Sequence, residues 1–166
     1  MKKFGSTGKK AAVVSTINGD ANVPFYKALG NQGVSAEDIP VVAFSVGEEE
    51  LSGLDTGPLV GHLAAWNYFQ SVESDENEAF IKKWKKFAGK KRVTNDPMEA
   101  TYIGFNMWAK AVEKAGTTDV DTVEQAMIGI TTPNLTGGIA VMNSNHHLSK
   151  PVLIGEIQDA VQIASA

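Results

Sequence analysis

Cysteine is absent from the 166-residue sequence. This absence excludes disulfides, thiolate nucleophiles, iron–sulfur clusters and cysteine-based zinc sites. Long apolar runs are absent as well, because the stretch Ala11–Val14 is far shorter than the roughly 20 residues of a membrane helix. The same stretch is too short for a signal-peptide core after Lys2 and Lys3. We therefore expect a chain that spans no membrane and lacks a signal peptide.

An excess of positive charge is also missing. The chain has 15 lysines and arginines against 19 acidic residues, which gives a formal net charge of −4. A nucleic-acid binder needs a basic field to neutralise phosphate, so we expect no nucleic-acid partner. The content of 43% hydrophobic and 20% charged residues is typical of a globular domain with one modest core.

Motifs for catalysis or metal binding are not found. The carboxylates of Glu48–Glu50 are consecutive, so they point in different directions and suit the start of a helix. His146 and His147 are adjacent without a third ligand at helical spacing, which a catalytic zinc site requires. No glycine motif for nucleotides is present, and no nucleophile has a base beside it in sequence, although distant residues can meet in space. We expect no enzyme activity, no metal and no cofactor.

Short apolar runs alternate with helical spacing in the first part of the chain. The runs end at turn residues, as buried parallel strands do. Asn22 is a candidate N-cap for the first helix, with Pro24 in its first turn. The pattern predicts an α/β fold with a parallel sheet, with strands at 11–16, 41–45 and 59–69 and helices at 23–29 and 48–51.

Two amphipathic helices follow, each with an acidic start and a basic end. They are predicted at 75–87 and 97–115, the second with Asp96 as N-cap and Pro97 at the first helical position. Large aromatic residues line their apolar faces. The last part of the chain predicts a helix at 121–128 and strands at 139–142, 152–157 and 161–164, around a turn at 143–145.

Polar residues follow the first two predicted strands. They occupy Ser15–Asp20 and Ser45–Glu48, at the carboxyl ends of parallel strands, where open α/β sheets hold ligands. The same residue types are those that turns and helix caps require. A small polar ligand site and a purely structural role both fit this pattern.

Several stretches resemble the urea-type substrate-binding proteins of ABC transporters, which belong to the branched-chain amino-acid and amide class of type I periplasmic binding proteins. The resemblance runs in order from about Ala11 to Ile157. It rests on the stretches 14–22, 38–41, 61–71, 92–100 and 145–151.

The resemblance implies a partial type I periplasmic-binding-protein fold, because the family members are considerably longer and the similarity covers only their later part. The implied fold has parallel-sheet βα units of one lobe and helices that, in the family, cover the other lobe. We expect a lead-in at 1–10, βα units of the second lobe at 11–70, a helical segment that crosses to the first lobe at 71–130, and returning strands and a tail at 131–166.

The resemblance also implies a function and a site. The chain would bind urea, a short-chain amide or an amino acid in the periplasm and deliver it to an ABC transporter permease. Trp66 and Tyr68 would line the hinge side of the site, although aromatic residues at strand spacing are more often core. The other ligand contacts carried over from the family fall on Ser15, Thr16, Asn18, Asp20, Ser45 and Glu48.

An alternative class stays open: a truncated, ligand-free module for interaction or amide-sensing regulation. In either case the aromatic residues of the two amphipathic helices need an apolar cover. These residues are Phe80, Trp84, Tyr102, Phe105 and Trp108. Without the first-lobe sheet, several of them would face water. We therefore expect a homo-oligomer or a segment-swapped dimer. His146, His147 and Lys150 match the family without a binding role, and we interpret them as structural.

Overall fold

The computed structural model describes residues 3, 6 and 8–159. The chain divides into two compact units: unit 1 contains residues 1–66 and 153–166, and unit 2 contains residues 67–152. The chain therefore passes from one unit to the other twice, after Trp66 and after Val152. None of the described helices combines the length and the apolar character that a membrane span needs.

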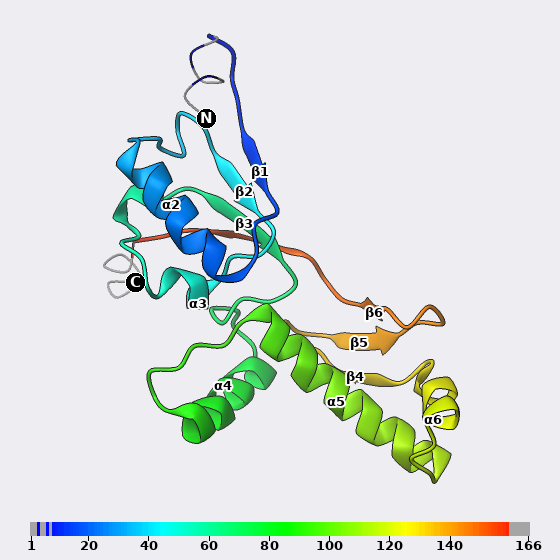
Figure 1. The fold of residues 1–166 in the computed structure, drawn as a ribbon. Coiled ribbons are helices and arrows are strands. Elements are labelled where there is room, and N and C mark those ends of the chain that lie inside the picture. The colour runs from blue at the N-terminus through cyan, green and yellow to red at the C-terminus, as the bar shows by residue number, and fades with distance from the viewer. Residues whose placement is uncertain (1–2, 4–5, 7, 160–166) are drawn as a thin grey trace. The chain divides into compact units, whose positions relative to one another are not determined.

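Unit 1 is built on a four-stranded sheet with the order β1-β2-β3-β7. Three strands run parallel, as predicted, and β7 is antiparallel to β3 with Leu153 opposite Trp66. The mixed α/β architecture with a parallel sheet is confirmed (Figure 1). The strands are β1 (Val13–Ser15), β2 (Val41–Ala43), β3 (Leu63–Trp66) and β7 (Leu153–Glu156).

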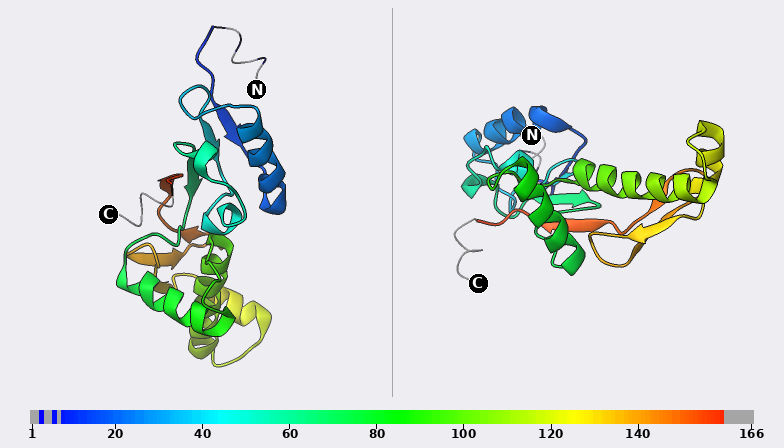
Figure 2. Two further views of the ribbon diagram at one scale, coloured as in Figure 1. Left: turned by 90° about the vertical axis from the view of Figure 1, so that its left-hand side faces the viewer. Right: turned by 90° about the horizontal axis from the view of Figure 1, so that it is seen from below.

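Two helices connect the parallel strands of unit 1. Helix α2 (Asn22–Asn31) follows β1, and the short α3 (Glu48–Leu51) follows β2. Helix α2 lies against one side of the sheet (Figures 1 and 2). The buried core of this unit includes Tyr26, Leu29, Val41 and Ala43. We expected β1 to be a buried strand, but it lies at the edge of the sheet and the side chain of Val14 is exposed.

Unit 2 combines three helices with a small antiparallel sheet of order β4-β5-β6. Its two apolar clusters are Ile103, Met107, Ala140 and Met142, and Tyr68, Phe80 and Leu135. The first cluster packs the middle of α5 against β5. The elements are α4 (Asp75–Ala88), α5 (Asp96–Ala115), α6 (Val120–Met127), β4 (Thr131–Pro133), β5 (Ile139–Met142) and β6 (Leu148–Ser149).

Several predicted boundaries need correction. The third strand is shorter than 59–69, because Gly57–Leu59 forms a 3₁₀ turn before it. Helix α5 is capped by Asn95, whose Oδ1 accepts the N–H of Met98 at 3.1 Å, and not by Asp96. Asp96 is the first helical residue, so its carboxylate is available to a distant part of the chain. The strand predicted at 161–164 lies outside the described residues.

The aromatic residues of α4 and α5 divide into buried and exposed ones. Phe80 is buried against Tyr68 and Leu135, so unit 2 itself supplies the apolar cover that this side chain needs. The side chains of Phe105 and Trp108 are 63% and 43% exposed, with ring centroids 5.7 Å apart. Several aromatic side chains of these helices therefore face water, as expected.

Candidate functional site

The polar residues after β1 and β2 lie at the same edge of the sheet. The two strands are parallel neighbours with Ser15 opposite Ala43, so both chains leave the sheet side by side. The N–H of Phe44 donates to the main-chain oxygen of Ser15 at 3.1 Å, which continues the pairing beyond β2. The Ser45 hydroxyl then donates a hydrogen bond to Oδ1 of Asn18. The structure thus brings together two residues that the sequence placed in separate loops.

The buried side chain of Asn22 joins the two loops. Its side chain is fully buried, and its Nδ2 donates to the main-chain oxygens of Ile17 at 3.1 Å, Gly19 at 3.2 Å and Ser45 at 3.0 Å. One amide group therefore links the loop after β1 to the loop after β2. We predicted Asn22 as the N-cap of α2, which was wrong: Ala21 occupies the cap position, and the Asn22 side chain turns inward to the two loops.

The predicted residues after β1 differ in exposure. Ser15 is buried, and its hydroxyl accepts the N–H of Ile17 at 3.4 Å, a local contact of the kind that turns use. Thr16, Asn18 and Asp20 are exposed. Ser15 therefore supports the loop, while the other three present a hydroxyl, a carboxamide and a carboxylate to solvent.

The loop between β2 and α3 carries the acidic residues of the site. The Glu50 carboxylate accepts the N–H of Gly47 at 2.9 Å and caps α3, and burial raises the pKa of this carboxyl. Glu48 is partly buried at the first position of α3. A Cβ on Gly47 would lie 3.4 Å from the Trp66 ring, so Trp66 lies close to the loop that precedes Glu48.

Tyr68 belongs to unit 2, so the group at the strand ends of unit 1 does not include it. It is buried, its hydroxyl donates to Oδ1 of Asn77 at 2.7 Å, and Oγ1 of Thr94 lies 2.8 Å from the same oxygen. These contacts make Tyr68 part of the core of unit 2. A contact with ligand stays a prediction for this residue.

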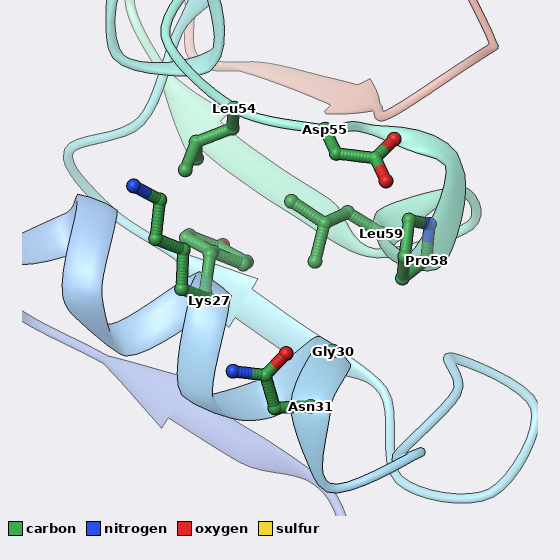
Figure 3. A pocket seen from close by; sticks show the side chains of 8 residues that line it. Lys27, Gly30, Asn31, Leu54, Asp55, Pro58 and Leu59 are labelled. Atoms are coloured by element: carbon green, nitrogen blue, oxygen red, sulfur yellow. The ribbon is translucent and has the colours of Figure 1, made fainter.

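A cavity of about 180 Å³ lies elsewhere in unit 1, between α2 and the segment that precedes β3. In Figure 3, Lys27 and Asn31 come from the helix, and Leu54, Asp55 and Leu59 come from the facing segment. Lys27 and Asn31 belong to the middle and the carboxyl end of α2, whereas Asn22, which joins the two polar loops, lies at its amino end. None of the residues predicted for the ligand lines this cavity.

His62 is a buried residue for which the sequence predicted no separate role. Its Nδ1 accepts the N–H of Val41 at 3.1 Å, so the imidazole joins the start of β2 to the residue before β3. Burial lowers the pKa of His62, because removal from water disfavours the charged form of the ring. A single histidine beside an apolar run gives no signal of such a contact in the sequence.

Residues 1–164 match the family described as periplasmic binding protein domain. The chain is 22% identical to Leu/Ile/Val-binding protein homolog 6 of Brucella melitensis, over 96% of this chain and 42% of that protein. It is also 35% identical to limonene hydroxylase of Geobacillus stearothermophilus, over 58% of this chain and 18% of that protein.

The fold is similar to that of a solved structure from Rhodopseudomonas palustris HaA2. That structure is a solute binding protein of an ABC transporter in complex with p-hydroxybenzoic acid, and the TM-score is 0.81 at 21% sequence identity. The similarity covers 96% of this chain and 44% of that chain. The chain thus spans less than half the length of each of these relatives.

Proposed function

Because the chain belongs to the periplasmic binding protein domain family, we propose that it is part of a solute-binding protein of an ABC transporter. Such a protein captures a small molecule reversibly, and no bond is made or broken. The fold similarity to a solute binding protein over 96% of this chain supports the proposal. By the same relationship the protein acts in the periplasm and hands its ligand to a membrane permease.

The observation that carries the proposal is the strand-end group of unit 1, which consists of Thr16, Asn18, Asp20, Ser45 and Glu48 around Asn22. Hydroxyl, carboxamide and carboxylate groups supply hydrogen-bond donors and acceptors at the edge of a parallel sheet. Asn22 holds both loops in place before any ligand arrives. A site fixed in advance loses less conformational entropy on binding. The group forms one wall of the proposed site.

The charge of this wall selects a ligand class. Asp20 and Glu48 carry carboxylates, which attract ammonium groups and accept hydrogen bonds from amide N–H groups. The same carboxylates repel the carboxylate of an aromatic acid, which, unlike an amino acid, has no ammonium group to offset the repulsion. We therefore favour urea, a short-chain amide or an amino acid over p-hydroxybenzoic acid, the ligand of the structurally similar protein from Rhodopseudomonas palustris.

Isothermal titration calorimetry of the full chain tests the proposal. The ligands are urea, acetamide, leucine and p-hydroxybenzoate, each titrated at pH 7. We expect saturable heat with at least one of the first three and none with p-hydroxybenzoate. Saturable heat with p-hydroxybenzoate alone would overturn the ligand class. Silence with all four would overturn the proposed function and favour a ligand-free interaction module.

A further inference from the structure

Seven of the 15 cationic residues of the chain lie in one segment of unit 2, residues 82–92. The segment contains no acidic residue, whereas the rest of the chain has eight cationic and 19 acidic residues. The segment therefore carries a formal charge of +7 and the rest of the chain −11. We name residues 82–92 the basic segment. It comprises the second half of α4, whose acidic residues are all in its first turn, and part of the loop that leads to α5 (Figure 1).

The loop part of the basic segment is held beside the end of α4. The N–H of Gly89 donates to the main-chain oxygen of Lys85 at 3.1 Å, which closes the last turn of the helix. The indole N–H of Trp84 donates to the main-chain oxygen of Val93 at 3.2 Å, so the chain returns to the helix after the loop. Residues 90–92 lie between these two contacts. The cations of the loop are therefore held close to those of the helix.

An aromatic side chain at the same place is exposed to water. Phe87 continues the apolar stripe of α4 on which Phe80 is buried, yet the Phe87 side chain is 87% exposed. Its ring centroid lies 6.3 Å from that of Trp84. Lys83 precedes Phe87 by one helical turn, so the two side chains occupy neighbouring positions of the helix surface. The basic segment thus combines a cluster of cations with an exposed apolar ring.

The stability of unit 2 does not account for this concentration of charge. Cations in the last turn of a helix complement its dipole, which gives a reason for Lys85 and Lys86 alone. Like charges four residues apart on a helix, such as Lys82 and Lys86, repel each other. Among the residues that the structure describes, no side-chain hydrogen bond or ion pair is made by Lys82, Lys83, Lys86, Lys90 and Lys91. These charges are therefore available to a partner outside the chain.

Lysines around an exposed phenylalanine fit the surface of an anionic bilayer. A cluster of about four to eight cations on an amphipathic helix is attracted to acidic lipid headgroups. An apolar ring such as that of Phe87 enters the boundary between headgroups and acyl chains. Six of the seven cations are lysines, whose point charges suit a diffuse negative surface, whereas nucleic-acid recognition favours the planar fork of arginine. A lipid surface therefore fits the basic segment better than a nucleic acid does.

We propose that the basic segment docks the protein onto the surface of a bilayer that contains acidic lipids. Its lysines supply the electrostatic attraction, and Phe87 is the apolar anchor. The end of α4 and the loop lie at the surface, and no part of them crosses the bilayer. Each lysine near such a surface strengthens partitioning by roughly 5-fold, and salt weakens the attraction by screening. Docking does not rest on the proposed function, whereas its benefit, delivery of a solute close to a membrane permease, does.

Flotation of the full chain with lipid vesicles tests the proposal and needs no solute. The vesicles contain phosphatidylcholine alone, or phosphatidylcholine with an equal amount of phosphatidylglycerol, at about 0.1 M sodium chloride. The test variant is Lys90→Gln with Lys91→Gln, at two exposed loop positions where loss of the charge should leave the fold intact. The matched control is Lys110→Gln with Lys114→Gln, which removes the same charge from exposed positions of α5.

We expect the parent protein to float with the vesicles that contain phosphatidylglycerol and not with phosphatidylcholine alone. Raising sodium chloride to about 0.5 M should weaken this partitioning strongly. The test variant should partition roughly 10-fold less or weaker still, and the control should change by less than about 2-fold. A parent that floats with neither kind of vesicle, or equally with both, overturns the proposal. Equal losses in the test variant and the control overturn it as well.

Phe87→Ser separates the contribution of the ring from that of the charges. Because the Phe87 side chain is exposed, the variant should keep the stability of the parent, and we expect it to partition several-fold less. Unchanged partitioning overturns the role of the ring as an anchor. Fluorescence anisotropy with a single-stranded thymidine oligonucleotide, at the same salt concentration, provides the comparison with a nucleic acid. A parent that binds the oligonucleotide and does not float with the phosphatidylglycerol vesicles overturns the lipid partner in favour of a nucleic acid.

Discussion

The side-chain amide of Asn22 donates a hydrogen bond to the main-chain oxygen of Ser45, 23 residues further along the chain, at 3.0 Å. Through this contact and the bonds to Ile17 and Gly19, a single buried residue sets the relative position of the two loops that carry the strand-end group. The proposed ligand site depends on that arrangement.

Replacing Asn22 by aspartate tests the role of its donors. The carboxylate would face three main-chain oxygens, and a buried charge without a partner costs at least about 2 kcal/mol. We expect Asn22→Asp to lower the free energy of unfolding by at least this amount in guanidinium chloride. Asn31→Asp, at the exposed end of the same helix, is the control and should have little effect. Equal stabilities of the two variants would contradict the arrangement.

Side chains of the strand-end group should contribute to ligand binding. Loss of one hydrogen bond to ligand costs about 1 kcal/mol, so we expect Thr16→Ala and Glu48→Ala each to weaken binding by roughly 5-fold or more. His147→Ala should leave binding unchanged, because His147 lies in unit 2 and we assign it no ligand contact. Calorimetry with the ligand that binds the parent protein gives the comparison. Equal losses in all three variants would show that the assigned residues are wrong.

The stability of unit 1 should depend on the protonation of His62. Burial lowers the pKa of this residue below 6.5, its value without such burial, so the unfolded chain takes up a proton first as the pH falls. The stabilising effect of the neutral ring is complete above pH 6.5 and is lost below it, by up to about 1.4 kcal/mol per pH unit. Unfolding at pH 7.5 and 5.5 should show a smaller loss for His62→Gln than for the parent. An identical loss in both would contradict the prediction.

The contribution of Glu99 to stability should have the opposite pH dependence to that of His62. Burial raises the pKa of its carboxyl, against the lowering effect of Lys150 and with a smaller raising effect of Asp96. The folded chain therefore takes up the proton before the unfolded chain does, and the parent gains stability as the pH falls toward 4.5. The free energy of unfolding of the parent relative to that of Glu99→Gln should be higher at pH 5 than at pH 7. A lower value at pH 5 would mean that the ion pair outweighs the cost of burial.

The exposed aromatic residues of α5 predict self-association. Phe105 and Trp108 form an apolar surface that another copy can cover. We expect the chain to elute above the 17.7 kDa of a monomer in size-exclusion chromatography with light scattering. Phe105→Ser with Trp108→Ser should shift it toward the monomer with little loss of stability. A monomeric parent at high concentration would contradict the prediction.

The sequence predicted the local elements well where one physical signal dominates. The helices 75–87 and 97–115 have strong apolar periodicity and opposite charges at their ends, and the structure places α4 and α5 within one residue of those bounds. The strands 11–16 and 41–45 are recognisable because β-branched residues precede turn residues. The ends of strands were predicted less accurately. Glycine and proline around residue 58 favour a turn, which the apolar pattern from residue 59 onward does not indicate.

Contacts between distant residues could not be predicted in this way. An asparagine before a proline-containing helix looks like a cap, and only the fold brings the oxygen of Ser45 within reach of Asn22. Glu99 and Lys150 are 51 residues apart, and each looks like an ordinary surface charge. The contacts of Tyr68 with Asn77 and Thr94 likewise depend on packing that no local pattern records.

The most direct test of the central claim is an NMR titration of the ¹⁵N-labelled chain with urea, followed through the backbone amides. The account predicts saturable shifts concentrated at residues 16–20 and 45–48, the loops that Asn22 joins. Shifts confined to the cavity lined by Lys27, Leu54 and Asp55, with the two loops unchanged, would contradict it.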